Sequence, residues 1–152
     1  MAAVGNVATT ALIDLYSSPN PVYQAGPSHG QATMYLSHTT LLDGQVLLAG
    51  GQDPQGNPVH AAQLYRPVSN RMEAVAPTWA AHQYHSNMWL DQTGRAILVG
   101  GNPRRGSVQP LVERFEPWYV DVSNRPVLTS APSTIPTTSP SPPRCSWRPA
   151  LP

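Results

Sequence analysis

The chain reads Val46-Leu47-Leu48-Ala49-Gly50-Gly51 and then, fifty positions later, Ala96-Ile97-Leu98-Val99-Gly100-Gly101. The same offset of fifty takes Leu64-Tyr65-Arg66-Pro67 to Arg114-Phe115-Glu116-Pro117, and Leu15-Tyr16 precedes Leu64-Tyr65 by forty-nine. Features that recur at one fixed spacing indicate an internal repeat, and a repeat of this length is one structural unit copied along the chain.

Each repeat has the pattern of short strands separated by turns. The run Gln45–Ala49 is nearly all apolar, as in a strand covered on both faces. Asp43-Gly44 before it suits a hairpin turn, and Gly50-Gly51 after it permits a sharp bend. The sequence predicts almost no helix, a last pair of strands of one repeat within Ala11–Gly26, and strands at Ala11–Tyr16, Ser37–Leu42, Gln45–Ala49, Ala61–Arg66, Arg71–Ala76, Ser86–Leu90, Ala96–Val99 and Val112–Glu116.

A period of about fifty residues with four strands per period resembles the kelch repeat, in which each repeat forms one blade of a β-propeller. The resemblance implies an all-β fold and a partial propeller of about two four-stranded blades. Propellers need about four to eight blades to close, so the sequence is expected to be a fragment. An ordinary antiparallel sandwich with coincidental glycine pairs is the alternative fold.

Composition excludes several classes of function. The net charge is +1, 11% of the residues are charged, and the only adjacent basic pair is Arg104-Arg105, which argues against nucleic acid as a partner. No apolar run reaches the roughly 18 residues of a membrane span, and Met1–Thr10 lacks the basic start of a secretory leader. The single cysteine, Cys145, cannot form an internal disulfide.

Three motifs in order make the family resemblance more specific. Gln83-Tyr84-His85-Ser86 resembles the tyrosine–histidine–serine motif of the copper radical oxidases, the galactose and glyoxal oxidase group. The stretch from Val112 to Tyr119 resembles the last propeller strand of those enzymes, and Arg125-Pro126 resembles the start of their C-terminal immunoglobulin-like domain. The resemblance covers Ala11 to Ala131, which corresponds to the C-terminal blades only.

The resemblance implies copper as the cofactor, with Tyr84 as an axial ligand and catalytic proton acceptor and His85 as an equatorial ligand. Imidazole nitrogen and phenol oxygen suit Cu(II). Successive residues of a regular strand point to opposite faces, so both can reach one metal only at the start of the strand. The family also needs a tyrosine cross-linked to a cysteine and a second histidine, and the matching regions are not in this sequence.

The implied function is oxidation of a small aldehyde or primary alcohol by O₂, which gives H₂O₂, in an enzyme class that is mostly extracellular. With an incomplete site, this chain is expected to be inactive. Missing blades or self-association would cover its open ends. The alternative is a non-catalytic kelch-repeat module that binds a protein or a glycan through its loops.

The sequence predicts three regions: a partial galactose oxidase-like propeller at 1–120, a linker with the beginning of an immunoglobulin-like domain at 121–135, and a disordered tail rich in Pro, Ser and Thr at 136–152. Trp79, Trp89 and Trp118 are predicted to fill the space between blades. The other histidines, His29, His38, His60 and His82, are predicted to have surface or packing roles.

Overall fold

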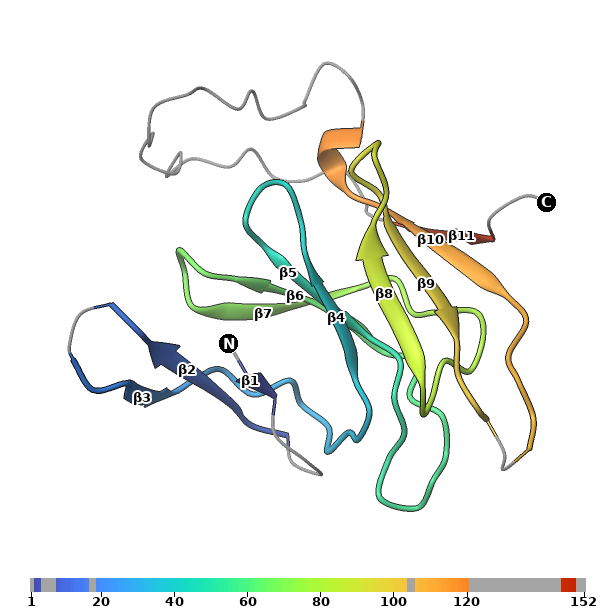
Figure 1. Cartoon of the computed structure of the whole chain (residues 1–152), viewed down its shortest axis with the longest axis horizontal. Coiled ribbons are helices and arrows are strands. Elements are labelled where there is room, and N and C mark those ends of the chain that lie inside the picture. Colours follow the sequence, from blue (N-terminus) through green and yellow to red (C-terminus); the bar gives the residue numbers. More distant parts are fainter. Residues whose placement is uncertain (1, 4–7, 17–18, 104–105, 121–145, 150–152) are drawn as a thin grey trace.

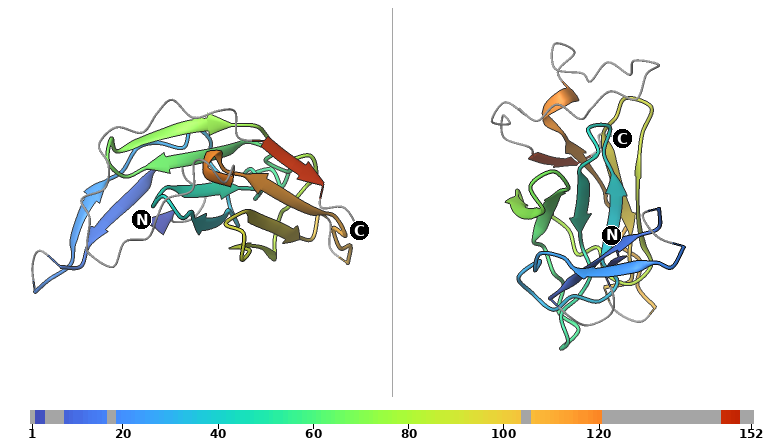
Figure 2. Two further views of the ribbon diagram at one scale, coloured as in Figure 1. Left: turned by 90° about the horizontal axis from the view of Figure 1, so that it is seen from above. Right: turned by 90° about the vertical axis from the view of Figure 1, so that its left-hand side faces the viewer.

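The computed structural model describes residues 2–3, 8–16, 19–103, 106–120 and 146–149. These residues form three antiparallel sheets in an open arrangement (Figures 1 and 2). In the described part of the chain the only helix is the 3-10 turn η1 (Trp118–Val120). No helix among these residues is long and apolar enough to cross a membrane. The prediction of an all-β chain is confirmed.

Each sheet follows the chain in simple antiparallel order. The first sheet has the order β1-β2-β3, the second β4-β5-β6-β7, and the third β8-β9-β10-β11. The strands are β1 (Ala2–Ala3), β2 (Thr10–Asp14), β3 (Val22–Ala25), β4 (Ser37–Thr40), β5 (Val46–Ala49), β6 (Ala62–Arg66), β7 (Arg71–Val75), β8 (Ser86–Leu90), β9 (Ala96–Gly100), β10 (Val112–Glu116) and β11 (Ser146–Pro149). All eight strands predicted from the sequence are present, with ends within two residues of the prediction.

The second and third sheets pack against each other through two faces that are not equivalent in the repeat. Register places Leu47 opposite Leu64 on one face of the second sheet, which also carries Ala49 and Ala62 and is called its front face. The back face of the third sheet carries Ala96, Leu98, Glu113, Phe115 and Trp147. The apolar residues of these two faces form one buried core, since Leu47, Ala96, Leu98 and Phe115 are fully buried. Burial of this apolar surface holds the two repeats together.

Polar contacts join the same two sheets at both ends of β4. The Ser37 hydroxyl lies 2.8 Å from the Ser86 hydroxyl, which connects β4 to β8. At the opposite end, the Tyr119 hydroxyl donates to the Gly94 carbonyl oxygen at 2.8 Å and accepts from the Leu42 amide at 3.1 Å. Figure 1 shows β4 and β8 side by side at this junction.

The prediction of a disordered tail is wrong for Ser146–Pro149. These residues form β11, which pairs with β10 and makes the third sheet four-stranded. Trp147 explains the pairing, because its side chain is 3% exposed and its ring lies 5.2 Å from the ring of Phe115. The rest of the predicted tail, and the predicted linker and immunoglobulin-like start at 121–135, lie outside the described residues.

The tryptophans follow the prediction only in part. Trp118 packs against the core and donates its indole N–H to the Asp43 carboxylate at 2.7 Å. Trp79 and Trp89 are 69% and 46% exposed. The prediction is wrong for Trp79, which lies in a surface loop. Trp89 lies on the face of the third sheet that turns away from the second, and no described sheet packs there, so for Trp89 the prediction stays untested.

Candidate functional site

Tyr84 and His85 lie immediately before β8, which begins at Ser86. His85 has a φ of 65°, in the left-handed region that side chains other than glycine seldom adopt. This backbone corner brings the two rings together, and they stack with centroids 3.7 Å apart and planes inclined by 30°. The corner thus meets the geometric condition set by the sequence, that both rings lie on one side of the chain. Both side chains are exposed.

The same corner occurs one repeat earlier at Tyr35, which has a φ of 57°. The backbone around the two corners is also hydrogen-bonded alike. The Gln52 amide donates to the Met34 carbonyl oxygen at 2.9 Å, and the Asn102 amide donates to the Tyr84 carbonyl oxygen at 2.7 Å. Each of these positions differs from its counterpart by fifty, so the repeat extends to backbone conformation.

The two corners meet in an open groove. The edge of one tyrosine ring faces the other, with the centroids of Tyr35 and Tyr84 4.6 Å apart. The groove measures ≈390 Å³ and is lined by residues 35–38 and 84–88. Its floor includes the Ser37–Ser86 contact that joins β4 to β8. The groove is therefore lined by the rings of Tyr35, Tyr84 and His85, and it is large enough for a small organic molecule.

The remaining histidines do not join Tyr84 and His85 in a metal cluster. His38 is exposed and lines the same groove from β4. His82 is fully buried, and both of its ring nitrogens contact oxygen atoms of the protein. His60 Nδ1 contacts the Thr78 carbonyl oxygen at 3.0 Å. Across the described residues, no group of three or more His, Cys, Asp or Glu side chains is placed to hold a metal ion.

A buried polar cluster around Glu113 was not predicted from the sequence. Glu113 is 1% exposed and lies among the apolar residues on the back face of the third sheet. Its carboxylate accepts hydrogen bonds from the backbone amides of Trp79 at 2.9 Å and Ala80 at 2.7 Å, and contacts His82 Nε2 at 3.0 Å. His82 Nδ1 lies 2.8 Å from the Gly100 carbonyl oxygen. The cluster anchors the loop that connects the second sheet to the third.

Burial raises the pKa of Glu113, but the hydrogen bonds from His82 and from the amides of Trp79 and Ala80 outweigh it, so the pKa falls below its ordinary value of 4.5. The ionised carboxylate is the form that these donors stabilise. Because the cluster has almost no exposed surface, its role is structural. One sequence feature could have indicated this buried cluster: Gln63 and Glu113 are both polar and occupy the same position of two repeats.

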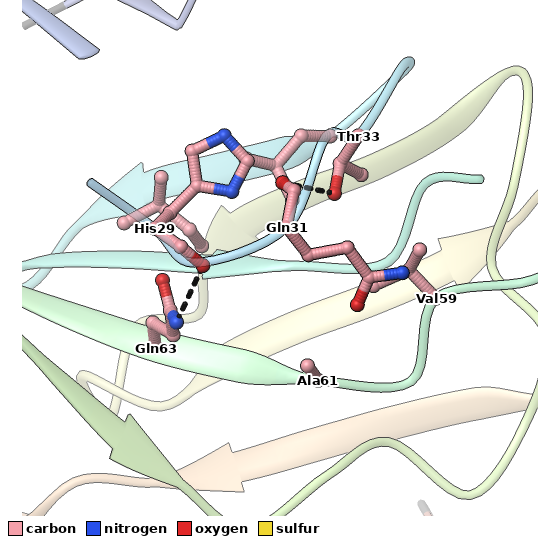
Figure 3. A pocket seen from close by; sticks show the side chains of 8 residues that line it. His29, Gln31, Thr33, Val59, Ala61 and Gln63 are labelled. Carbon is pink, nitrogen blue, oxygen red and sulfur yellow. Dashed lines mark hydrogen bonds between the residues drawn. The ribbon is translucent and has the colours of Figure 1, made fainter. Parts of the chain in front are cut away.

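Gln63 has the corresponding anchoring role in the second sheet. Its side-chain amide donates to the His29 carbonyl oxygen at 2.8 Å and so holds the segment that leads into β4 (Figure 3). A cavity of ≈20 Å³ lies beside it, with His29, Thr33 and Val59 among the lining residues (Figure 3). This volume fits about one water molecule, so the cavity is too small for a substrate.

Comparison with known proteins adds no assignment. No protein-family model matches the chain, and no curated protein matches it.

Proposed function

We propose that this chain forms consecutive blades of a kelch-type β-propeller related to the copper radical oxidases, and that Tyr84 and His85 form part of a Cu(II) site. The observation that carries the proposal is the corner at His85, where a phenol and an imidazole stack at 3.7 Å on one side of the chain. Two neighbouring residues seldom present both rings together, because a regular strand sends them to opposite faces.

The propeller part of the proposal is supported by the way the repeats pack. Two four-stranded antiparallel sheets, β4 to β7 and β8 to β11, meet front face to back face around one apolar core. Blades of a propeller stack in this head-to-tail manner around an axis. Both inner strands, β4 and β8, lie at the groove that carries Tyr84 and His85. In a complete propeller, this groove would belong to the wall of the central channel.

The donors present fit one part of a copper centre. His85 would supply a ring nitrogen and Tyr84 a phenol oxygen, both ligand types that Cu(II) accepts. His38 lines the same groove, but among the described residues no group of three or more His, Cys, Asp or Glu side chains is placed to hold a metal ion. The donor set therefore does not fit a complete oxidase site, and we propose that this chain binds Cu(II) weakly and does not turn over aldehydes or primary alcohols.

Cu(II) titration followed by electron paramagnetic resonance tests the copper part. We expect His85→Ala to weaken binding by more than about tenfold, since it removes the nitrogen ligand. Tyr84→Phe should weaken binding less, because a phenol oxygen would be a weaker ligand for Cu(II) than an imidazole nitrogen. His38→Ala is the matched control, since His38 is also exposed in the same groove. An equal loss of Cu(II) affinity in the His38 and His85 variants would reject the proposed site. Sustained H₂O₂ production with glyoxal or galactose would reject the proposal that this chain is catalytically inactive.

The second candidate is a kelch module that binds a protein or a glycan without catalysis. The open groove favours it, because Tyr35 and Tyr84 are 51% and 41% exposed and present ring edges and faces to solvent. Exposed aromatic rings of this kind commonly form binding surfaces. Cu(II) binding that is unaffected by His85→Ala would favour this candidate over the copper site.

A further inference from the structure

Two tyrosines from neighbouring repeats have their rings in contact at the junction between the second and third sheets. The ring centroids of Tyr35 and Tyr84 lie 4.6 Å apart, with the ring planes inclined by 63°. Aromatic pairs in proteins have centroid separations of about 4.5–7 Å, so this contact is a close one. Tyr35 lies two residues before β4, and Tyr84 lies two residues before β8. The contact therefore joins the starts of two strands that are distant in the sequence.

The backbone on both sides of this contact is held by hydrogen bonds. The amides of Met34 and Gln52 each donate to the carbonyl oxygen of the other residue, at 2.8 and 2.9 Å. The Asn102 amide donates to the Tyr84 carbonyl oxygen at 2.7 Å. The serine hydroxyls of β4 and β8, 2.8 Å apart, connect the two strands directly. The fold therefore keeps the two rings together whether or not they are bonded to each other.

Both phenols can be reached from solvent. Tyr35 and Tyr84 are 51% and 41% exposed, and both line the open groove. Within the described part of the chain, neither phenol oxygen has a hydrogen-bond partner. The hydroxyl protons can thus pass to water, and the rings can turn without breaking a hydrogen bond.

The other four tyrosines of the chain lack this combination of exposure and ring contact. Tyr65 and Tyr119 are 6% and 0% exposed, so an oxidant in solution does not reach them. Tyr16 and Tyr23 are 97% and 69% exposed, but neither ring contacts another tyrosine ring among the described residues. They provide an internal control for the effect of exposure alone.

We propose that Tyr35 and Tyr84 are a modification site, at which hydrogen peroxide acting through a peroxidase joins the two rings in a dityrosine cross-link. Each phenol loses one electron and its hydroxyl proton and becomes a phenoxyl radical. The two radicals form one carbon–carbon bond between ring carbons next to the C–O carbons. Each joined carbon then releases its proton, and each oxygen takes up one proton. The two electrons and two protons lost overall reduce one hydrogen peroxide molecule to two water molecules.

Proximity favours this reaction over coupling between separate molecules. Two groups held in contact react as one molecule, which removes the entropic cost of bringing them together. The bond would close a loop that contains the whole of the second sheet, β4 to β7. Closing a loop lowers the entropy of the unfolded chain, so the cross-linked chain is the more stable one. The inference does not depend on the proposed copper site, because the oxidant comes from solution.

Oxidation of the full chain by a peroxidase and hydrogen peroxide, with a metal chelator present, tests the site. At low protein concentration we expect a monomeric product that is lighter by two hydrogen atoms, shows dityrosine fluorescence and contains residues 35 and 84 in one cross-linked peptide. Tyr35→Phe and Tyr84→Phe should each lower its yield at least about tenfold, since the remaining tyrosine has no phenol in contact with it. Tyr16→Phe and Tyr23→Phe are the matched controls and should leave the yield unchanged, although they remove the more exposed phenols.

The cross-linked chain should also unfold at a higher urea concentration than the untreated chain, whereas oxidant treatment of Tyr84→Phe should not raise its midpoint. Absence of the monomeric product under conditions that couple free tyrosine would overturn the proposal. So would an unchanged yield in Tyr35→Phe, or a cross-link that maps to Tyr16 or Tyr23. Circular dichroism verifies that each variant is folded. If a variant is not, the cross-linked peptide of the native chain decides, because any pairing other than 35 with 84 rejects the site.

Discussion

The Nε2 atom of His82 lies 3.0 Å from a carboxylate oxygen of Glu113, and the two side chains are 0% and 2% exposed. Two backbone amides of the inter-sheet loop donate to the same carboxylate, and a carbonyl oxygen of the Gly100 corner accepts from the other side of the imidazole. The pair therefore links the loop, β9 and β10 at the junction between the second and third sheets.

Glu113→Gln should destabilise the chain by about 3 kcal/mol, because removing one partner of a buried pair leaves the other without compensation. Glu73→Gln is the control. Glu73 pairs with Arg66 on the surface, and exposed ion pairs contribute about 0–1 kcal/mol. Urea denaturation followed by circular dichroism measures both values. Equal losses in the two variants would show that the buried pair has no special role.

The stability of the chain should fall in acid through Glu113. Its pKa in the folded chain is lower than in the unfolded chain, so its contribution is complete above the ordinary value of 4.5 and is lost as the pH falls through the folded value. Unfolding free energies measured from pH 7 downwards should decrease below about pH 4.5. The decrease should be smaller in Glu113→Gln, and parallel curves for the two proteins would contradict the assignment.

Gly50→Ala should destabilise far more than Gly56→Ala. Both glycines have a positive φ, of 75° and 85°, so an alanine pays the left-handed cost of about 1–2 kcal/mol at either position. A Cβ at Gly50 would also lie 2.5 Å from the His82 carbonyl oxygen, whereas a Cβ at Gly56 meets nothing within 4 Å. The difference in melting temperature between the two variants measures the effect of the close approach between Gly50 and the His82 carbonyl oxygen. Similar losses of stability in both variants would mean that the loop around His82 moves to accommodate the added Cβ.

Trp147→Ala should cost about 3–5 kcal/mol, as expected for a large aromatic residue removed from a core. Trp147 is 3% exposed and packs against Phe115, whereas Trp79 is 69% exposed. Trp79→Ala should therefore change the unfolding free energy little. Chemical denaturation of both variants checks this, and an unchanged stability of Trp147→Ala would show that β11 adds nothing to the third sheet.

Local pattern was sufficient for most of the fold. Apolar runs such as Gln45–Ala49, ended by glycine pairs, marked the strands because the turn chemistry and the strand period agree there. Gly50-Gly51 and Gly100-Gly101 also marked the repeat. Close packing gives the physical reason for glycine at three of these four positions. A Cβ at Gly50 or Gly101 would clash with residues 82 and 83 of the loop between the second and third sheets, and a Cβ at Gly51 would clash with the chain before β4.

Long-range contacts set the limit of prediction. Ser146–Pro149 carries little local strand signal, and it becomes a strand only because the outer edge of β10 and the ring of Phe115 are available to it. Trp79 is exposed because its loop is held by its backbone amide rather than by its side chain. For the site, the sequence predicted that Tyr84 and His85 would lie at the start of a strand, but not that the ring of Tyr35 would contact the ring of Tyr84.

The left-handed corner at positions 35 and 85 has a consequence for how such a site can arise. The conformational cost at this corner is present in both repeats, although one presents a phenol and the other an imidazole. A duplicated repeat therefore inherits a backbone conformation that already presents its side chain to solvent. One substitution at this position in one repeat can then introduce a new functional group, while the other repeat keeps its original side chain.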